Sequence, residues 1–204
     1  MAFTFNTSKK ELTDLLEAWI LISLAFGILL SRGRLFSMQM IESFLLSALT
    51  VGLGFLLHEL AHKIVAQRYG CFAEFRASIK MLVIAVAMSF FGFLIAAPGA
   101  VMIHGQVSKR QNGKISVAGP IVNLALALIF LPIYFLGDIA GIGIIAKLGS
   151  YGVWINSFLA LFNMLPFFIL DGKKVLAWNK KVYFFVTVPA FILTFLASQL
   201  IPLV

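Results

Sequence analysis

Apolar residues dominate the chain in six long runs, and short segments between the runs hold most of the charged residues. The runs cover approximately residues 15–31, 41–66, 79–103, 115–137, 147–170 and 182–204. A helix needs roughly 20 apolar residues to cross the hydrocarbon core of a membrane, and most of these runs approach that length. The pattern predicts an all-α polytopic membrane protein with about five to six transmembrane helices.

The third run differs from the others because helix-breaking residues interrupt it. Gly92 lies near its centre, and Ala97, Pro98 and Gly99 follow. Val, Ile and Phe are frequent in this part of the chain, and these residues favour extended structure. We therefore expect residues 79–106 to form a re-entrant or partly extended segment, which must pack against other helices or line a wet cavity because unpaired backbone cannot face lipid.

Composition supports the membrane interpretation. Hydrophobic residues make up 61% of the chain and charged residues 12%, whereas about a quarter of the residues of a soluble domain are charged. The segments between the runs are too short for a separate soluble domain, so residues 1–204 are expected to form a single membrane-embedded domain. No small-residue cleavage site follows the first run, which predicts a retained first span. The one cysteine, Cys71, excludes an intrachain disulfide.

The net charge of +8 invites comparison with nucleic-acid-binding proteins, but the basic residues lie in short loops beside apolar runs. This placement favours the lipid bilayer as partner, and no nucleic acid is expected. If each of the six runs crosses the membrane once, six loop cations lie on one membrane face and nine on the other, which indicates no orientation. A re-entrant third run changes the division to twelve against three, the three being Arg32, Arg34 and Lys147. By the positive-inside rule, the protein is expected in the cell membrane with the twelve-cation side in the cytoplasm.

Candidate chemistry is concentrated in the second run, which contains His58, Glu59 and His62. Residues four apart share one face of a helix, so both imidazoles can bind one Zn²⁺ while Glu59 reaches a water molecule beside it. Ionisable side chains at membrane depth are costly, which favours a functional role over a chance match. The pattern is typical of the active site of a zinc protease, here within a membrane.

Zinc in a hydrolase usually takes three protein ligands. The further candidates after His62 are Glu74, His104, Asp138 and Asp171. Glu74 lies among basic residues, where a solvated or salt-bridged carboxylate is expected. Asp138 is expected on the opposite membrane face, and His104 at an interface where lone histidines are usually wetted.

Asp171 remains, because Pro166 and Gly172 predict a broken helix beside it. By spacing alone, a ligand and an ordinary polar turn before Lys173 are about equally consistent with Asp171.

Three motifs in this order resemble the site-2 protease family of intramembrane zinc metalloproteases, in its prokaryotic form without an inserted peptide-binding module. They are the pentad His58–His62, Gly119-Pro120-Ile121-Val122-Asn123, and Asn-x-x-Pro-x-x-x-Leu-Asp-Gly at residues 163–172. The resemblance covers roughly residues 53–178. Many members carry another proline shortly before the Asp-Gly pair, where this chain has Phe168 and Ile169.

The resemblance implies that His58, His62 and Asp171 bind one Zn²⁺ per chain and that Glu59 is the catalytic base. It also implies core helices at about residues 41–66, 115–137 and 147–170, with 15–31 and 182–204 as a peripheral, movable wall. The implied reaction is hydrolysis of a peptide bond in or near a transmembrane segment of another protein.

Asn163 is a candidate for binding the substrate carbonyl, or else for an interhelical hydrogen bond, and the interhelical role is favoured for Asn123. Two other functions remain open. A membrane-anchored zinc peptidase acting on soluble peptides would use Glu74 as its third ligand. A non-catalytic metal-binding membrane protein or transporter would not need Glu59.

Overall fold

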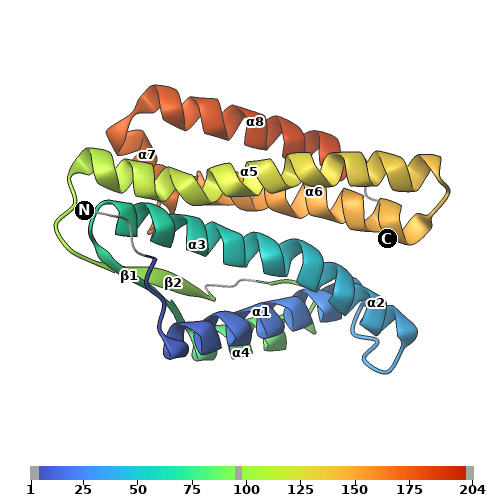
Figure 1. Ribbon diagram of the computed structural model, residues 1–204. Coiled ribbons are helices and arrows are strands. Elements are labelled where there is room, and N and C mark those ends of the chain that lie inside the picture. Colours follow the sequence, from blue (N-terminus) through green and yellow to red (C-terminus); the bar gives the residue numbers. More distant parts are fainter. Residues whose placement is uncertain (1–4, 95–97, 201–204) are drawn as a thin grey trace.

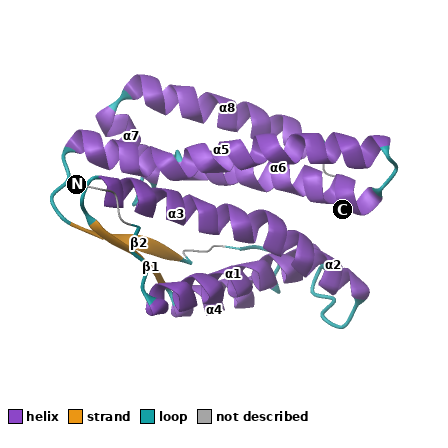
Figure 2. Cartoon of the chain, viewed as in Figure 1, coloured by secondary structure: helices purple, strands orange, loops and turns teal. Residues whose placement is uncertain are grey.

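The computed structural model describes residues 5–94 and 98–200 and is dominated by helices (Figures 1 and 2). A π-helical turn, η1, joins α2 and α3 into one helical rod over Met38–Arg68. The elements in chain order are α1 (Lys9–Leu30), α2 (Met38–Ser47), η1 (Ala48–Gly52), α3 (Leu53–Arg68), β1 (Phe72–Ala77), α4 (Ile79–Ser89), β2 (Gly99–His104), α5 (Lys109–Ile139), α6 (Gly143–Asn163), α7 (Asp171–Trp178) and α8 (Lys180–Ser198).

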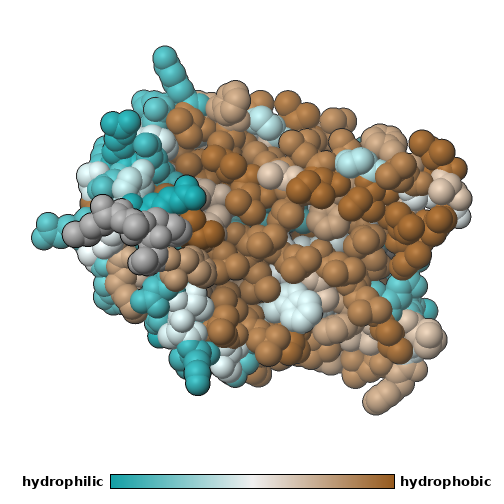
Figure 3. Space-filling view, viewed as in Figure 1, coloured by the Kyte–Doolittle hydropathy of each residue, from teal (hydrophilic) through white to brown (hydrophobic). Residues whose placement is uncertain are grey.

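Within the described residues, five helical segments are long and apolar enough to cross a membrane: α1, the rod Met38–Arg68, α5, α6 and α8. Large apolar side chains lie exposed on them, such as Phe185 at 80% and Ile139 at 83%. Figure 3 shows an apolar middle, with hydrophilic residues gathered mainly at the end that carries the N-terminus and α7. Exposed apolar area on this scale suits lipid better than water. The chain is a multi-pass membrane protein.

The helices extend beyond the apolar runs at several ends, because capping residues lie outside the runs. Ser108 begins α5 with a capping box completed by Gln111, seven residues before the run at 115. By contrast, α6 ends at Asn163, before the predicted limit at 170. Pro166 cannot donate a helical hydrogen bond and disfavours helical backbone at Leu165. The last predicted run includes residues 201–204, which lie outside the described residues.

The interrupted third run forms a short helix and a strand. The helix α4 has 11 residues, about 17 Å of rise, which is too short to cross the hydrocarbon core. The strand β2 then pairs antiparallel with β1, in a register that places Phe75 opposite Val101. The chain therefore returns to the side it left, as expected for a re-entrant, partly extended segment; residues 95–97 lie outside the described residues. The strand β1 was not predicted.

The helices are arranged around α5, which packs against α3 and α6 along much of its length. On one side of this group, α1 packs against α2 and α4, and on the other side α8 packs against α6. Figure 1 shows α3, α5 and α6 between α1 and α8. This arrangement brings the end of α3, the start of α5 and the start of α7 to the same end of the molecule.

Candidate metal centre

Two histidines of α3 and the first residue of α7 meet in a buried cluster. The Nε2 atoms of His58 and His62 lie 3.4 Å and 3.0 Å from Oδ2 of Asp171. One ligand atom from each residue lies within 4.8 Å of the others, and all three residues are buried. Two neutral imidazoles and a carboxylate are a donor set that Zn²⁺ accepts.

Asp171 reaches the histidines because the chain reverses sharply after α6. Phe168 has a positive φ of 52°, which a residue with a side chain seldom adopts. A Cβ on Gly172 would lie 2.0 Å from the carbonyl oxygen of Met164, so only glycine fits where α7 passes the end of α6. This turn contains Phe168 and Ile169 without a second proline, and it still presents Asp171 to α3.

The other ring nitrogen of each histidine is held by a hydrogen-bond acceptor on α5. Nδ1 of His58 donates to Oδ1 of Asn123 at 2.5 Å, and Nδ1 of His62 donates to the carbonyl oxygen of Ile115 at 2.7 Å. A proton on each Nδ1 leaves the lone pair on Nε2, the atom that faces Asp171. The rings are thus oriented as histidine ligands of a metal usually are, so the residues present fit a Zn²⁺ ion.

Glu59 is half-buried and lies between the two histidines in sequence, with its carboxylate facing the strand β2. The backbone N–H of Val101 hydrogen-bonds to this carboxylate. The strand β2 therefore lies next to the helix that carries the histidines.

Asp171 lies outside the membrane-spanning helices, and its electrostatic surroundings favour the charged form. Burial acts to raise its pKa, but in the metal-free protein the protonated forms of His62 and His58 outweigh burial and hold the pKa of this carboxyl well below its ordinary value. The residue is therefore available as an anionic ligand at neutral pH.

The other ligand candidates, Glu74, His104 and Asp138, are not among the residues that meet in this cluster. Glu74 forms an ion pair with Arg76, as expected for a carboxylate among basic residues. His104 lies at the end of β2 beside the ring of Phe72. Asp138 lies near the end of α5, and Asn163 donates to the carbonyl oxygen of Leu159 in its own helix.

Sequence reasoning missed two features of the centre. The interhelical hydrogen bond favoured for Asn123 exists, but one of its partners is His58, so the residue supports a candidate ligand. The contributions of Val101 and Ile115 come from the backbone, which leaves no signal in the side-chain sequence.

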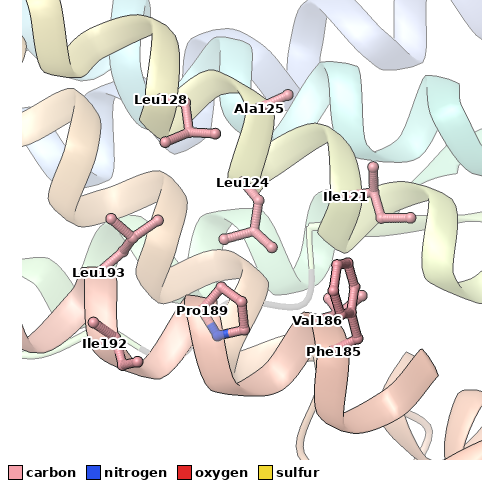
Figure 4. Close-up of a pocket in the computed structure, with 9 residues that line it drawn as sticks. All are labelled: Ile121, Leu124, Ala125, Leu128, Phe185, Val186, Pro189, Ile192 and Leu193. Atoms are coloured by element: carbon pink, nitrogen blue, oxygen red, sulfur yellow. The ribbon is translucent and has the colours of Figure 1, made fainter. Parts of the chain in front are cut away.

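An apolar groove of about 630 Å³ lies between α5 and α8, away from the histidine cluster (Figure 4). Residues of α5 line one wall and residues of α8, including Pro189, line the other. Its lining contains no titratable side chain. The groove therefore offers no group for catalysis.

Comparison with known proteins identifies two relatives, both from Methanocaldococcus jannaschii. A protein provisionally named a zinc metalloprotease is 36% identical over 187 residues, which are 91% of this chain and 93% of that protein. A second, named a zinc metalloprotease, is 28% identical over 122 residues, which are 59% of this chain and 30% of that protein. No family model and no solved structure matches the chain.

Proposed function

Because the chain belongs to a zinc metalloprotease family, we propose that it is an intramembrane protease of the site-2 type, which hydrolyses a peptide bond in or near a transmembrane segment of another protein. The observation that carries the proposal is the buried cluster of His58, His62 and Asp171. The two histidines and Glu59 lie in the rod Met38–Arg68, which is long and apolar enough to span a membrane. His58 lies ten residues before the end of α3 at Arg68, about 15 Å along the helix axis. A site at that depth favours a substrate that is itself in the membrane.

The proposed reaction uses the side chains of the cluster in distinct roles. A Zn²⁺ ion held by His58, His62 and Asp171 would polarise the scissile carbonyl and lower the pKa of a water molecule toward neutrality. Glu59 accepts the proton of the attacking water and then delivers it to the leaving amine. Asn163 is proposed to donate a hydrogen bond to the substrate carbonyl; in this structure its amide donates to the carbonyl oxygen of Leu159.

The outer edge of β2 supports a specific mode of substrate binding. The N–H of Phe75 donates to Oε1 of Glu11, and Nη1 of Arg76 donates to the carbonyl oxygen of Phe75, so both backbone groups point away from β2. In an antiparallel pair, two residues that lie opposite each other either both direct their backbone N–H and C=O toward the partner strand or both direct them away from it. Val101 lies opposite Phe75, so it also points its N–H and C=O away from β1. The N–H of Val101 faces the carboxylate of Glu59.

Residues two apart in a strand direct their backbone N–H and C=O to the same edge, so Gly99 and Ile103 share the orientation of Val101. The outer edge of β2 therefore carries a row of outward backbone groups. Among the described residues, no strand pairs with this edge. We infer that an unwound stretch of substrate adds to β2 as a strand, which holds the scissile bond beside Glu59. A transmembrane helix hides its amides in its own hydrogen bonds, so it must unwind locally before it can pair in this way.

Activity of the purified protein in lipid vesicles, with a single-span protein as substrate, tests the proposal. Glu59→Gln is expected to lower kcat by about 10²–10⁴-fold because the proton acceptor is lost, while zinc content stays unchanged. Glu42→Gln, which removes a charge from an exposed ion pair with Lys147, is the matched control and is expected to retain activity. Full activity in Glu59→Gln would contradict the role of Glu59 as proton acceptor, and a wild type that binds zinc but cleaves no substrate would instead indicate a non-catalytic metal-binding protein.

A second comparison distinguishes substrates. Gly or Pro placed in the substrate helix is expected to increase cleavage, because local unwinding becomes easier. A soluble peptide of the same sequence is expected to be cleaved more slowly than the membrane-embedded form. Equal rates for stable and weakened helices, together with faster cleavage of the soluble peptide, would favour the soluble-peptide peptidase.

A further inference from the structure

A chain of buried amides connects His58 to α6, a helix that contributes no ligand to the candidate metal centre. Nδ2 of Asn123 donates to Oδ1 of Asn156 at 3.1 Å and to the carbonyl oxygen of Gly54 at 3.0 Å. Nδ2 of Asn156 in turn donates to the carbonyl oxygen of Gly152 at 3.0 Å. Both asparagine residues are fully buried.

The backbone carbonyls at the ends of this chain fix the direction of every hydrogen bond in it. Gly152 and Gly54 offer only carbonyl oxygens there, so Nδ2 of each asparagine must face its carbonyl. Oδ1 of Asn156 is then the acceptor for Asn123, and Oδ1 of Asn123 is the acceptor for His58. Nδ1 of His58 therefore carries the proton, and Nε2 keeps the lone pair.

The two histidines are held in different ways. The acceptor for His62 is a backbone carbonyl, that of Ile115, which helix α5 fixes without side-chain support. The acceptor for His58 is a side-chain amide that could rotate by 180° and present its NH₂ group instead. Asn156 and the carbonyl of Gly54 together oppose that rotation, because a rotated Asn123 would place its oxygen against both acceptors.

The space around this contact is also specific. A Cβ on Gly54 would lie 2.4 Å from Oδ1 of Asn156, so a glycine is needed where α3 approaches the amide. Buried polar groups at membrane depth are costly unless they are fully hydrogen-bonded, and this chain satisfies them only as a complete set.

We propose that Asn156 is a positioning residue for the metal centre, which acts through Asn123 to hold His58 in the tautomer and orientation that bind Zn²⁺. The inference rests on the proposed zinc site. It predicts that a residue on α6, out of contact with the ligands, controls metal affinity, and that the control passes through His58 and leaves His62 unaffected.

Zinc affinity of the purified protein in detergent, measured by competition with a chelator, tests this directly. Asn156→Leu, of similar volume, and the smaller Asn156→Ala are both expected to weaken zinc binding by about 10–100-fold, the usual effect of losing a residue that supports a ligand. Ser157→Ala is the matched control. Ser157 follows Asn156 in the same helix, and the substitution removes a buried hydroxyl that donates to the carbonyl oxygen of Trp154. Its zinc affinity is expected to match that of the wild type.

The double variant Asn123→Ala/Asn156→Ala distinguishes a relay from general destabilisation. Because Asn156 acts through Asn123, the double variant is expected to bind zinc no more weakly than Asn123→Ala alone. Additive losses would overturn the proposal, as would wild-type affinity in both Asn156 variants or an equal loss in Ser157→Ala.

Nitrogen NMR of ¹⁵N-histidine-labelled, zinc-free protein at pH 8 adds a readout that does not depend on metal. His58 is expected to hold its proton on Nδ1 in the wild type and to become a mixture of tautomers in Asn156→Ala, while His62 stays unchanged. An unchanged His58 would overturn the relay. Failure of the wild type to bind zinc, with the tautomer shift still present, would count against the proposed zinc function alone.

Discussion

Gly119 lies where α5 passes closest to the imidazole of His58. A Cβ at this position would lie 2.5 Å from Nε2 and 2.6 Å from two ring carbons. The ring cannot move aside freely, because Nδ1 is hydrogen-bonded to Asn123. The glycine therefore serves the geometry of the ligand as much as the packing of the helices.

We expect Gly119→Ala to weaken zinc binding by about tenfold or more, because the methyl group displaces the ring from its hydrogen bond. Gly143→Ala is the control, since nothing lies within 4 Å of the added Cβ. Chelator competition on both variants measures the effect, and circular dichroism checks that both remain helical. Wild-type zinc affinity in Gly119→Ala would contradict the assigned position of His58.

At the scale of single residues, the sequence predicts those site residues whose geometry depends only on neighbours in the chain. His58 and His62 follow from residues four apart on an apolar helix, and the broken helix at Pro166 from a single proline. Asn123 could be singled out only as a polar residue within a span, because its partners Gly54 and Asn156 are 69 and 33 residues away. Contacts across that separation depend on how α3, α5 and α6 pack, which the pattern of one chain does not specify.

At the scale of elements, a buried ion pair fixes α1 to α3 and to the strand pair. Nζ of Lys63 donates to Oε2 of Glu11 at 2.5 Å and to Oγ1 of Thr7 at 2.8 Å. The other oxygen of Glu11 accepts from the N–H of Phe75 at 2.9 Å. Both charged side chains are fully buried. The pair thereby sets the position of β1, and through β1 that of the β2 edge, relative to the helix of the histidines.

We expect Lys63→Met to destabilise the protein by about 3–5 kcal/mol, because it leaves Glu11 buried without its counter-ion. The double variant Glu11→Leu/Lys63→Met is expected to recover part of that loss. Unfolding in mixed detergent micelles measures the free energies. A loss below about 1 kcal/mol, as for an exposed ion pair, would show that the pair is not buried.

The sequence did not predict this connection. Lys63 is a single cation inside an apolar run, and Glu11 precedes the first run, 52 residues earlier. The strand β1 was missed for a related reason. Three successive residues, Ala73, Glu74 and Phe75, are buried, so β1 lacks the alternation of buried and exposed residues that marks a strand in a sequence. Its two edges are satisfied by β2 and Glu11, and neither partner is close in the sequence.

At the scale of the whole molecule, the hydrophilic end seen in Figure 3 is the end at which α5, α7 and α8 begin. Its loops carry the larger group of cations, and the loop between α1 and α2, with Arg32 and Arg34, lies at the other end of α1. From the positive-inside rule we propose that the histidine cluster lies nearer the cytoplasmic face. The loop cations divide twelve against three only because the chain returns at β2 to the side from which α4 began.

Cysteine labelling in intact cells tests the orientation, in a Cys71→Ser background because the single native thiol is buried. A membrane-impermeant maleimide is expected to label Arg34→Cys directly and Lys181→Cys only after the membrane is permeabilised. Labelling in the reverse order would place the cluster near the outer face.

Zinc content of the purified wild type, Asp171→Ala and Glu74→Ala, under limiting metal, tests the central claim most directly. We expect about one Zn²⁺ per chain in the wild type and in Glu74→Ala, and a clear loss in Asp171→Ala, because Asp171 completes the set with His58 and His62. Glu74 instead pairs with Arg76. Zinc that survives Asp171→Ala, or that is lost in Glu74→Ala, would contradict the ligand set.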